Sequence, residues 1–134
     1  MNGRLTLTVV TPERSVVAGA LCDEVTLPGL EGEMGILPAH TPLIALLGIG
    51  LVTFRDGAKK TSVAVRGGFA EIANDAVRVL ADEAAAKDAI DAAKAEREKT
   101  AAEARRADVV GDEQLDAANA DARFAEARIS VAAS

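Results

Sequence analysis

The 134-residue chain has no tryptophan or tyrosine, three phenylalanines, one cysteine and one histidine. A single cysteine excludes an internal disulfide. The scarcity of aromatic rings and a formal net charge of -6 argue against nucleic acid as a main partner, because clustered Lys and Arg supply that affinity. No apolar run approaches the roughly 18 residues that span a bilayer, and residues 1–7 lack a signal-peptide pattern. These absences favour a cytosolic, reduced protein with at most a peripheral membrane role.

Groupings of residues that carry catalysis are also missing. His40 is the only imidazole and has no partner His or Cys at metal-ligand spacing. The sequence contains neither a phosphate-binding loop nor a dinucleotide fingerprint. Carboxylates are abundant, but Asp23, Glu24, Glu31 and Glu33 fall in predicted turns and strands, where solvated surface positions account for them. We therefore predict that the chain is not an enzyme and holds no metal.

Glycine and proline define a change of composition near Ala84. All four prolines and ten of the eleven glycines precede it, whereas 18 of the 50 residues from Ala85 to Ser134 are alanine. Gly and Pro punctuate strands and turns, while Ala with Glu, Lys and Arg favours an uninterrupted helix. The sequence predicts two domains, a β-domain over residues 1–84 and a helical domain over residues 85–134.

The first half alternates apolar and polar residues with period two. The run from Arg4 to Val9 shows this pattern, and similar runs recur between turn signals such as Pro28-Gly29 and Asn74-Asp75. Many short strands at this spacing are typical of an antiparallel β-sandwich or flattened barrel. We expect about ten strands, by the spacing of these turn signals.

The second half changes to a helical period. Asp88 is expected to cap the first helix, with Asp91 in its first turn, and Asp112 to cap the second. The short connection at 109–112 predicts an antiparallel two-helix hairpin. The expected seam of the second helix comprises Leu115, Ala118, Ala122, Ala125, Ile129 and Ala132, and the matching stripe comprises Ala86, Ile90, Ala93, Thr100, Ala104 and Ala107.

An alanine-rich seam allows close helix approach but buries little apolar area. We therefore expect the hairpin to hold together weakly and to leave the sandwich at a cost of a few kcal/mol, a range in which a partner can shift a two-state equilibrium. The residues alone also leave open a generic β-sandwich adaptor with a coiled-coil arm, which would form a homodimer through the seam of the second helix.

One segment resembles a known family. Pro28 to Leu43 reads PGLEGEMGILPAHTPL, which is similar to the signature PGxEGExGILPxHxPL of the epsilon subunit of F-type ATP synthase. Val65 to Glu71 reads VRGGFAE and resembles the family's VxGGFxE hairpin, and RISVA from Arg128 to Ala132 resembles its closing RLSVA. These matches follow one another in the family's order and cover essentially the whole chain.

The resemblance implies a non-catalytic subunit of the central stalk, with a β-sandwich followed by a helical hairpin, which links the gamma subunit to the c-ring and couples proton transport to ATP synthesis. It places Glu31, Glu33 and Met34 at the c-ring interface and His40 and Pro42 at the gamma interface. It further implies a monomer when isolated. The implied location is peripheral, at the cytoplasmic face of a bacterial plasma (inner) membrane.

The resemblance also gives the hairpin a regulatory role. In its extended form it would inhibit ATP hydrolysis, with Arg123 and Arg128 contacting the catalytic beta subunit; as an alternative, both could be solvated cations on the helix surface. Some members bind ATP between the helices, which would use Asp91, Lys94 and Arg128 here and make the chain an ATP-sensing module. Because Lys94 replaces the motif's arginine, and Ala101 and Phe124 replace two further arginines, we predict that ATP binding is weak or absent.

Overall fold

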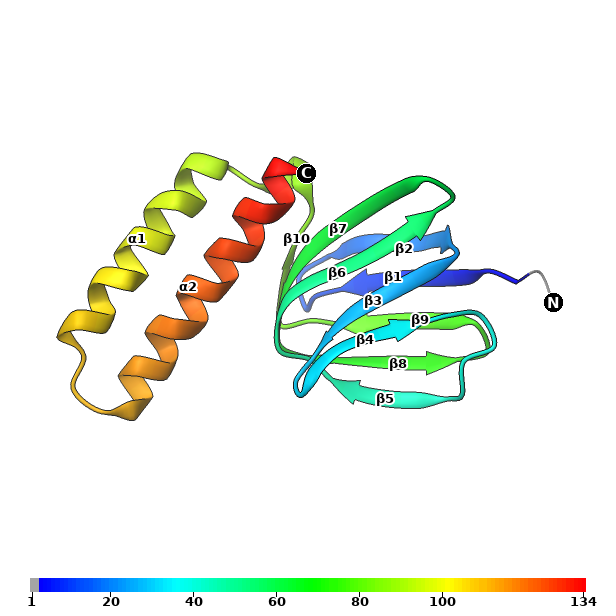
Figure 1. The fold of residues 1–134 in the computed structure, drawn as a ribbon, viewed down its shortest axis with the longest axis horizontal. Coiled ribbons are helices and arrows are strands. Elements are labelled where there is room, and N and C mark those ends of the chain that lie inside the picture. The colour runs from blue at the N-terminus through cyan, green and yellow to red at the C-terminus, as the bar shows by residue number, and fades with distance from the viewer. Residues whose placement is uncertain (1–2) are drawn as a thin grey trace.

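The structure, a computed structural model, describes residues 3–134 and shows two layers of strands with a pair of helices beside them (Figure 1). The strands are β1 (Leu5–Val10), β2 (Ser15–Cys22), β3 (Glu24–Gly29), β4 (Gly32–Ile36), β5 (Leu43–Leu46), β6 (Ile49–Asp56), β7 (Lys59–Arg66), β8 (Phe69–Ala73), β9 (Ala76–Leu80) and β10 (Glu83–Ala85). A short 3₁₀ turn, η1 (Lys87–Ala89), leads to helices α1 (Ala92–Asp108) and α2 (Asp112–Ala133).

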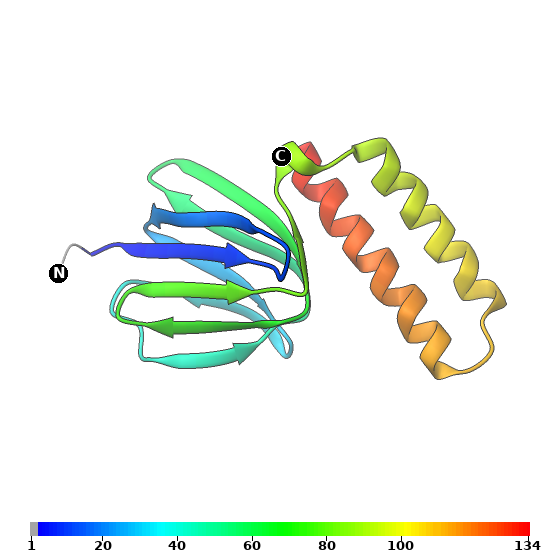
Figure 2. The ribbon, with the colours of Figure 1, turned by 180° about the vertical axis from the view of Figure 1, so that it is seen from behind.

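The strands form two five-stranded sheets. The first sheet has the order β2-β1-β9-β8-β5 and the second has the order β10-β7-β6-β3-β4. Figure 2 shows the layers from behind, with the helices again to one side of both. Neighbouring strands are antiparallel except β1 and β9, which pair in parallel. The predicted sandwich of about ten strands is confirmed.

The core lies between the two sheets and follows the period-two pattern. Leu5, Leu7 and Val9 of β1 are fully buried, whereas the intervening side chains are only partly covered. Strands of the second sheet contribute in the same way, because alternate side chains of a strand face opposite sides of its sheet. The largest fully buried side chains of this core are Leu5, Leu7, Leu27, Ile36, Ile72, Val9, Val25, Val52, Val63, Val65, Val77 and Val79.

The last strand carries the chain from the sandwich to the helices. β10 pairs with β7, with Ala84 opposite Val65 and Ala85 opposite Ala64. The strand thus continues one residue beyond Ala84. The hairpin therefore leaves from the edge strand of the second sheet.

The helix starts differ from the expected ones. Asp91, not Asp88, caps α1: its backbone is extended and its carboxylate accepts the backbone N–H of Lys94 at 3.1 Å. Asp88 lies in η1, which is separated from α1 by the extended residue Ile90. Asp112 is the first residue of α2 and follows Gly111, which has φ 100° and no side chain to act as a cap. The turn between the helices needs this left-handed backbone, which glycine adopts without strain.

The predicted helix seam is partly wrong. Ala118, Ala122 and Ala125 of α2 are buried as expected, but α1 buries Ala95 and Ala102. The stripe expected on α1 is instead largely exposed, including Ala93, Thr100, Ala104 and Ala107. The physical reason is that α2 lies between two partners, α1 and the second sheet, so one heptad stripe does not describe its contacts.

Candidate functional sites

The hairpin rests on the second sheet through a small apolar cluster. α2 packs on β6 and β7, where Phe124, Ala127 and Val131 meet the buried Ala64 of β7. Ile49, Leu51 and Ile90 lie at the edges of this cluster. Only one of the buried side chains is large, so the contact buries far less apolar surface than the core of the sandwich.

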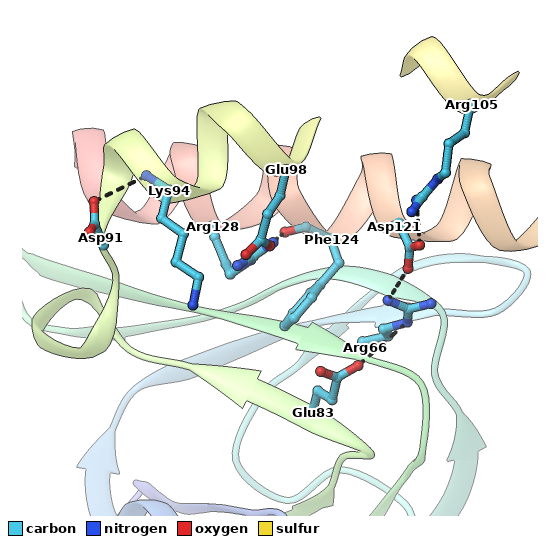
Figure 3. A network of polar contacts seen from close by, with 9 residues as sticks. All are labelled: Arg66, Glu83, Asp91, Lys94, Glu98, Arg105, Asp121, Phe124 and Arg128. Atoms are coloured by element: carbon cyan, nitrogen blue, oxygen red, sulfur yellow. Dashed lines mark hydrogen bonds and ion pairs between the residues drawn. The ribbon is translucent and has the colours of Figure 1, made fainter. Parts of the chain in front are cut away.

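A polar cleft of about 500 Å³ lies beside this cluster, between both helices and the edge of the sandwich (Figure 3). It brings together four cations and three carboxylates that lie far apart in the sequence. Its lining comprises Arg66, Glu83, Lys94, Glu98, Ala101, Arg105, Asp121, Phe124 and Arg128.

Asp121 joins three elements in this cleft. One carboxylate oxygen accepts from Arg66 Nη1 of β7 at 2.7 Å, and the other accepts from Arg105 Nη2 of α1 at 2.6 Å. Arg66 also lies 3.7 Å from a carboxylate oxygen of Glu83. The hydrogen bond from Arg66, with further help from its charge and from Arg105, holds the pKa of Asp121 below its usual value. Asp121 therefore fastens both helices to the sandwich.

Arg128 is enclosed within the hairpin. Its guanidinium donates to Glu98 of α1 at 2.6 Å and to the backbone carbonyl of Phe124 at 3.4 Å, and it lies 4.9 Å from the centroid of the Phe124 ring. Its side chain is 17% exposed. Arg123, by contrast, is exposed and forms no ion pair with any other residue of the described range 3–134. The two arginines predicted to touch the beta subunit thus have different surroundings.

The residues predicted for weak ATP binding are only partly brought together. Lys94 and Arg128 both line the cleft, as do Ala101 and Phe124 at the positions where the family motif has arginines. The carboxylate of Asp91 is engaged in capping α1. The guanidinium groups of the cleft already form ion pairs with Glu98 and Asp121. An anion that enters the cleft would therefore compete with these two carboxylates.

The residues predicted for the c-ring interface surround the β3–β4 turn. Glu31 and Glu33 are exposed, and Met34 is half-buried. A groove of about 500 Å³ runs from this turn to β5. Its lining comprises Gly29, Leu30, Glu31, Gly32, Glu33, Met34, Leu43, Ala45 and Leu46.

The residues predicted for the gamma interface lie elsewhere. His40 and Pro42 belong to the β4–β5 loop, at the end of the sandwich away from the helices, whereas the β3–β4 turn lies at the opposite end of β4 (Figure 1). His40 is half-buried, with Nδ1 2.7 Å from the backbone oxygen of Thr41, and Pro42 is exposed. The structure thus separates the two predicted interfaces by the length of one strand.

Sequence reasoning missed an apolar row on the outer face of the first sheet. Leu46, Phe69 and Leu80 are cross-strand neighbours on β5, β8 and β9, and they are 64%, 40% and 41% exposed. Ile44, two residues before Leu46, is 67% exposed and extends the row along the edge strand β5. Alternation alone could not identify the row, because these strands carry apolar residues on both faces. The row could be identified only from the register in which β5, β8 and β9 pair, because this register aligns the three side chains.

The described residues show neither a metal-binding cluster nor a helix that could span a membrane. Within residues 3–134, no cluster of three or more His, Cys, Asp or Glu side chains could hold a metal ion. Neither helix of that range combines the length and apolar character required to cross a bilayer.

These features define a class of protein in which a β-sandwich carries a docked helical hairpin and an exposed apolar row on one sheet. The comparisons with known proteins identify the family. Residues 4–87 match the β-sandwich domain of the ATP synthase delta/epsilon chain. The chain belongs to the ATP synthase epsilon chain family, whose members are non-catalytic subunits of the complex.

Curated relatives cover nearly the whole chain. An ATP synthase epsilon chain of Symbiobacterium thermophilum is 38% identical over 96% of this chain and 92% of its own length. The epsilon chain of Solibacter usitatus is 42% identical over 98% of both. A chain in the cryo-EM structure of the Euglena gracilis mitochondrial ATP synthase, OSCP/F1/c-ring, shares the fold with a TM-score of 0.80 at 21% identity, covering 100% of this chain and 84% of that one.

Proposed function

We propose that this chain is a rotor subunit that links the gamma subunit of the central stalk to the c-ring and so couples proton transport to ATP synthesis. The proposal places it peripherally at the cytoplasmic face of a bacterial plasma membrane, as a monomer when isolated. The helical hairpin acts as a brake on ATP hydrolysis when it leaves the sandwich and reaches the catalytic beta subunit.

The exposed apolar row carries the stalk-binding part of the proposal. A row of large apolar side chains on a flat sheet face marks a protein-binding surface, because burying it removes apolar area from water. Leu30 joins this surface to the β3–β4 turn, since its backbone N–H donates to the carbonyl of Leu46 at 2.9 Å. The gamma subunit on the row and the c-ring at Glu31 and Glu33 would therefore bind adjacent parts of one surface. His40 would extend the gamma contact to the end of the sandwich away from the helices.

The nature of the hairpin contact supports the brake. Phe124 is the largest buried side chain of the contact, and Asp121 supplies the ion pairs to the sandwich and to α1. A contact of this kind is weaker than a domain core and can be exchanged for another partner. Ala118, Ala122 and Ala125 of the α2 seam are already buried in the compact form, which counts against dimerisation through them.

The test is ATP hydrolysis by a matching catalytic head depleted of this subunit. We expect the full chain to inhibit and a version ending at Asp88, which retains all of β10, to bind without inhibiting. Arg123→Ala combined with Arg128→Ala in the full chain should relieve inhibition if these side chains contact the beta subunit. Circular dichroism of each variant would confirm that the sandwich is intact.

The outcomes separate the parts of the proposal. Binding of both forms with equal hydrolysis would exclude the brake and leave a coupling subunit. Absence of binding by either form would exclude the stalk role. Light scattering of the isolated chain adds an independent check, because a stable dimer would favour the adaptor alternative.

A further inference from the structure

The loop between β4 and β5 is held in a strained conformation by one carboxylate. Ala39 has φ 66°, a left-handed backbone that is rare for residues with a side chain. The backbone N–H of His40 donates to the carbonyl of Leu37 at 3.2 Å, which closes a turn with Pro38 and Ala39 at its centre. Such turns favour glycine at the position that Ala39 occupies.

Asp75 provides the group that fixes this turn. Its Oδ1 accepts the backbone N–H of Ala39 at 2.6 Å, across 36 residues of sequence. Its own carbonyl accepts the N–H of Thr6 at 2.9 Å, so the β8–β9 turn is anchored to β1. The Asp75 side chain therefore ties the loop that carries His40 to the rigid body of the first sheet.

The strain in this part of the molecule is concentrated at one contact. Three non-glycine residues of the described range 3–134 have positive φ, and they are Ala39, Asn74 and Asp75. Asn74 and Asp75 form the two-residue turn between β8 and β9, a position where Asn followed by Gly is the favoured pair. Strained backbone persists where the surroundings enforce it, and it clusters where a chain presents groups to a partner.

We propose that Asp75 is a positioning residue that pre-organises residues 37–42 for docking of the gamma subunit. The inference rests on the proposed role of this loop at the gamma interface. The loop exposes Leu37, Thr41 and Pro42 on the surface while the tie to Asp75 restricts its backbone. A loop already in its bound shape loses less conformational entropy on binding, so removing the tie should weaken binding without removing any contact.

The decisive variants are Asp75→Gly and Asp75→Asn. Glycine keeps the left-handed turn and removes the acceptor, whereas asparagine keeps an acceptor oxygen and also tolerates positive φ. Asn74→Gly is a matched control, because it changes the same turn without touching the tie. Full-length proteins would be compared by hydrogen exchange at Ala39 and His40, by thermal melting and by affinity for isolated gamma.

We expect Asp75→Gly to speed exchange at Ala39 by roughly tenfold and to weaken gamma binding by about fivefold to tenfold, the range of a lost hydrogen bond. Asp75→Asn and Asn74→Gly should stay within about twofold of wild type, below the roughly fivefold to tenfold expected for the lost hydrogen bond. Unchanged exchange at Ala39 in Asp75→Gly would overturn the tie itself. Faster exchange with unchanged affinity would overturn the positioning role, and failure of the wild-type chain to bind gamma would overturn both this role and the proposed interface.

Discussion

Replacing Asp121 by asparagine tests how the hairpin is fastened to the sandwich. The substitution keeps the side-chain shape and removes the charge that pairs with Arg66 at 2.7 Å and with Arg105 at 2.6 Å. The Asp121 side chain is 38% exposed and Arg105 is 55% exposed, so solvent screens both pairs and each contributes at the level of surface ion pairs. We expect the loss to reach about 1 kcal/mol in total, or about fivefold in the equilibrium for hairpin opening.

Native-state hydrogen exchange measures this opening directly. Amides of α2 around Ala125 should exchange about fivefold faster in Asp121→Asn than in the wild type, with little change in the strands. Raising the salt to about 0.5 M should reduce the difference, because screening weakens exposed pairs. Asp116→Asn is the matched control, since Asp116 is an exposed acid of the same helix with no ion pair to residues 3–134.

The effect should also depend on pH with a defined sign. The pKa of Asp121 is lowered in the folded state, chiefly by the hydrogen bond from Arg66. Its contribution is therefore fully present above the unfolded pKa of about 3.9 and is lost as pH falls from there through the lowered folded value. Equal exchange in Asp121→Asn and Asp116→Asn at neutral pH, or a difference that survives high salt unchanged, would refute the reasoning.

Three further predictions concern the hairpin, the apolar row and the cleft. Phe124→Ala should weaken hairpin docking by about 3 kcal/mol, because it leaves a cavity against Ala64, and α2 exchange would report it. Phe69→Ser should abolish tight gamma binding while leaving the melting temperature nearly unchanged, whereas Leu21→Ser, equally apolar but on β2 at the far edge of that sheet, should bind normally in a pull-down. Calorimetry with ATP should show weak or no binding, and a dissociation constant of order 1 μM, equivalent to about -8 kcal/mol, would contradict the prediction from the cleft.

The architecture could be predicted because it depends on local patterns. Alternation in residues 4–9 predicted which side chains of β1 are buried, and the loss of Gly and Pro after Ala84 predicted the helices. The cap of α1 could not be predicted, since Asp88 and Asp91 are equally suitable acceptors. The extended backbone of Ile90 decided between them by separating η1 from the helix.

The candidate sites likewise include features that the sequence predicted and features that it did not. The signature around Glu31 and Glu33 was visible in the sequence, and so was the replacement of motif arginines by Lys94 and Phe124. The pairing of Arg128 with Glu98 could not be seen in the sequence, because it depends on how α1 and α2 pack together. The burial of Arg128 and the exposure of Arg123 follow from that packing.

The strands, the helices and the family could be read from the order of residues, because hydrophobic period, turn residues and a contiguous signature are properties of neighbouring positions. The contacts between distant residues became visible in the folded chain: Arg66 with Asp121, Ala39 with Asp75, and Phe69 with its cross-strand neighbours Leu46 and Leu80. These contacts arise from strand register and from the docking of the hairpin. Register and docking are set by the summed packing of the whole core, which no local pattern encodes.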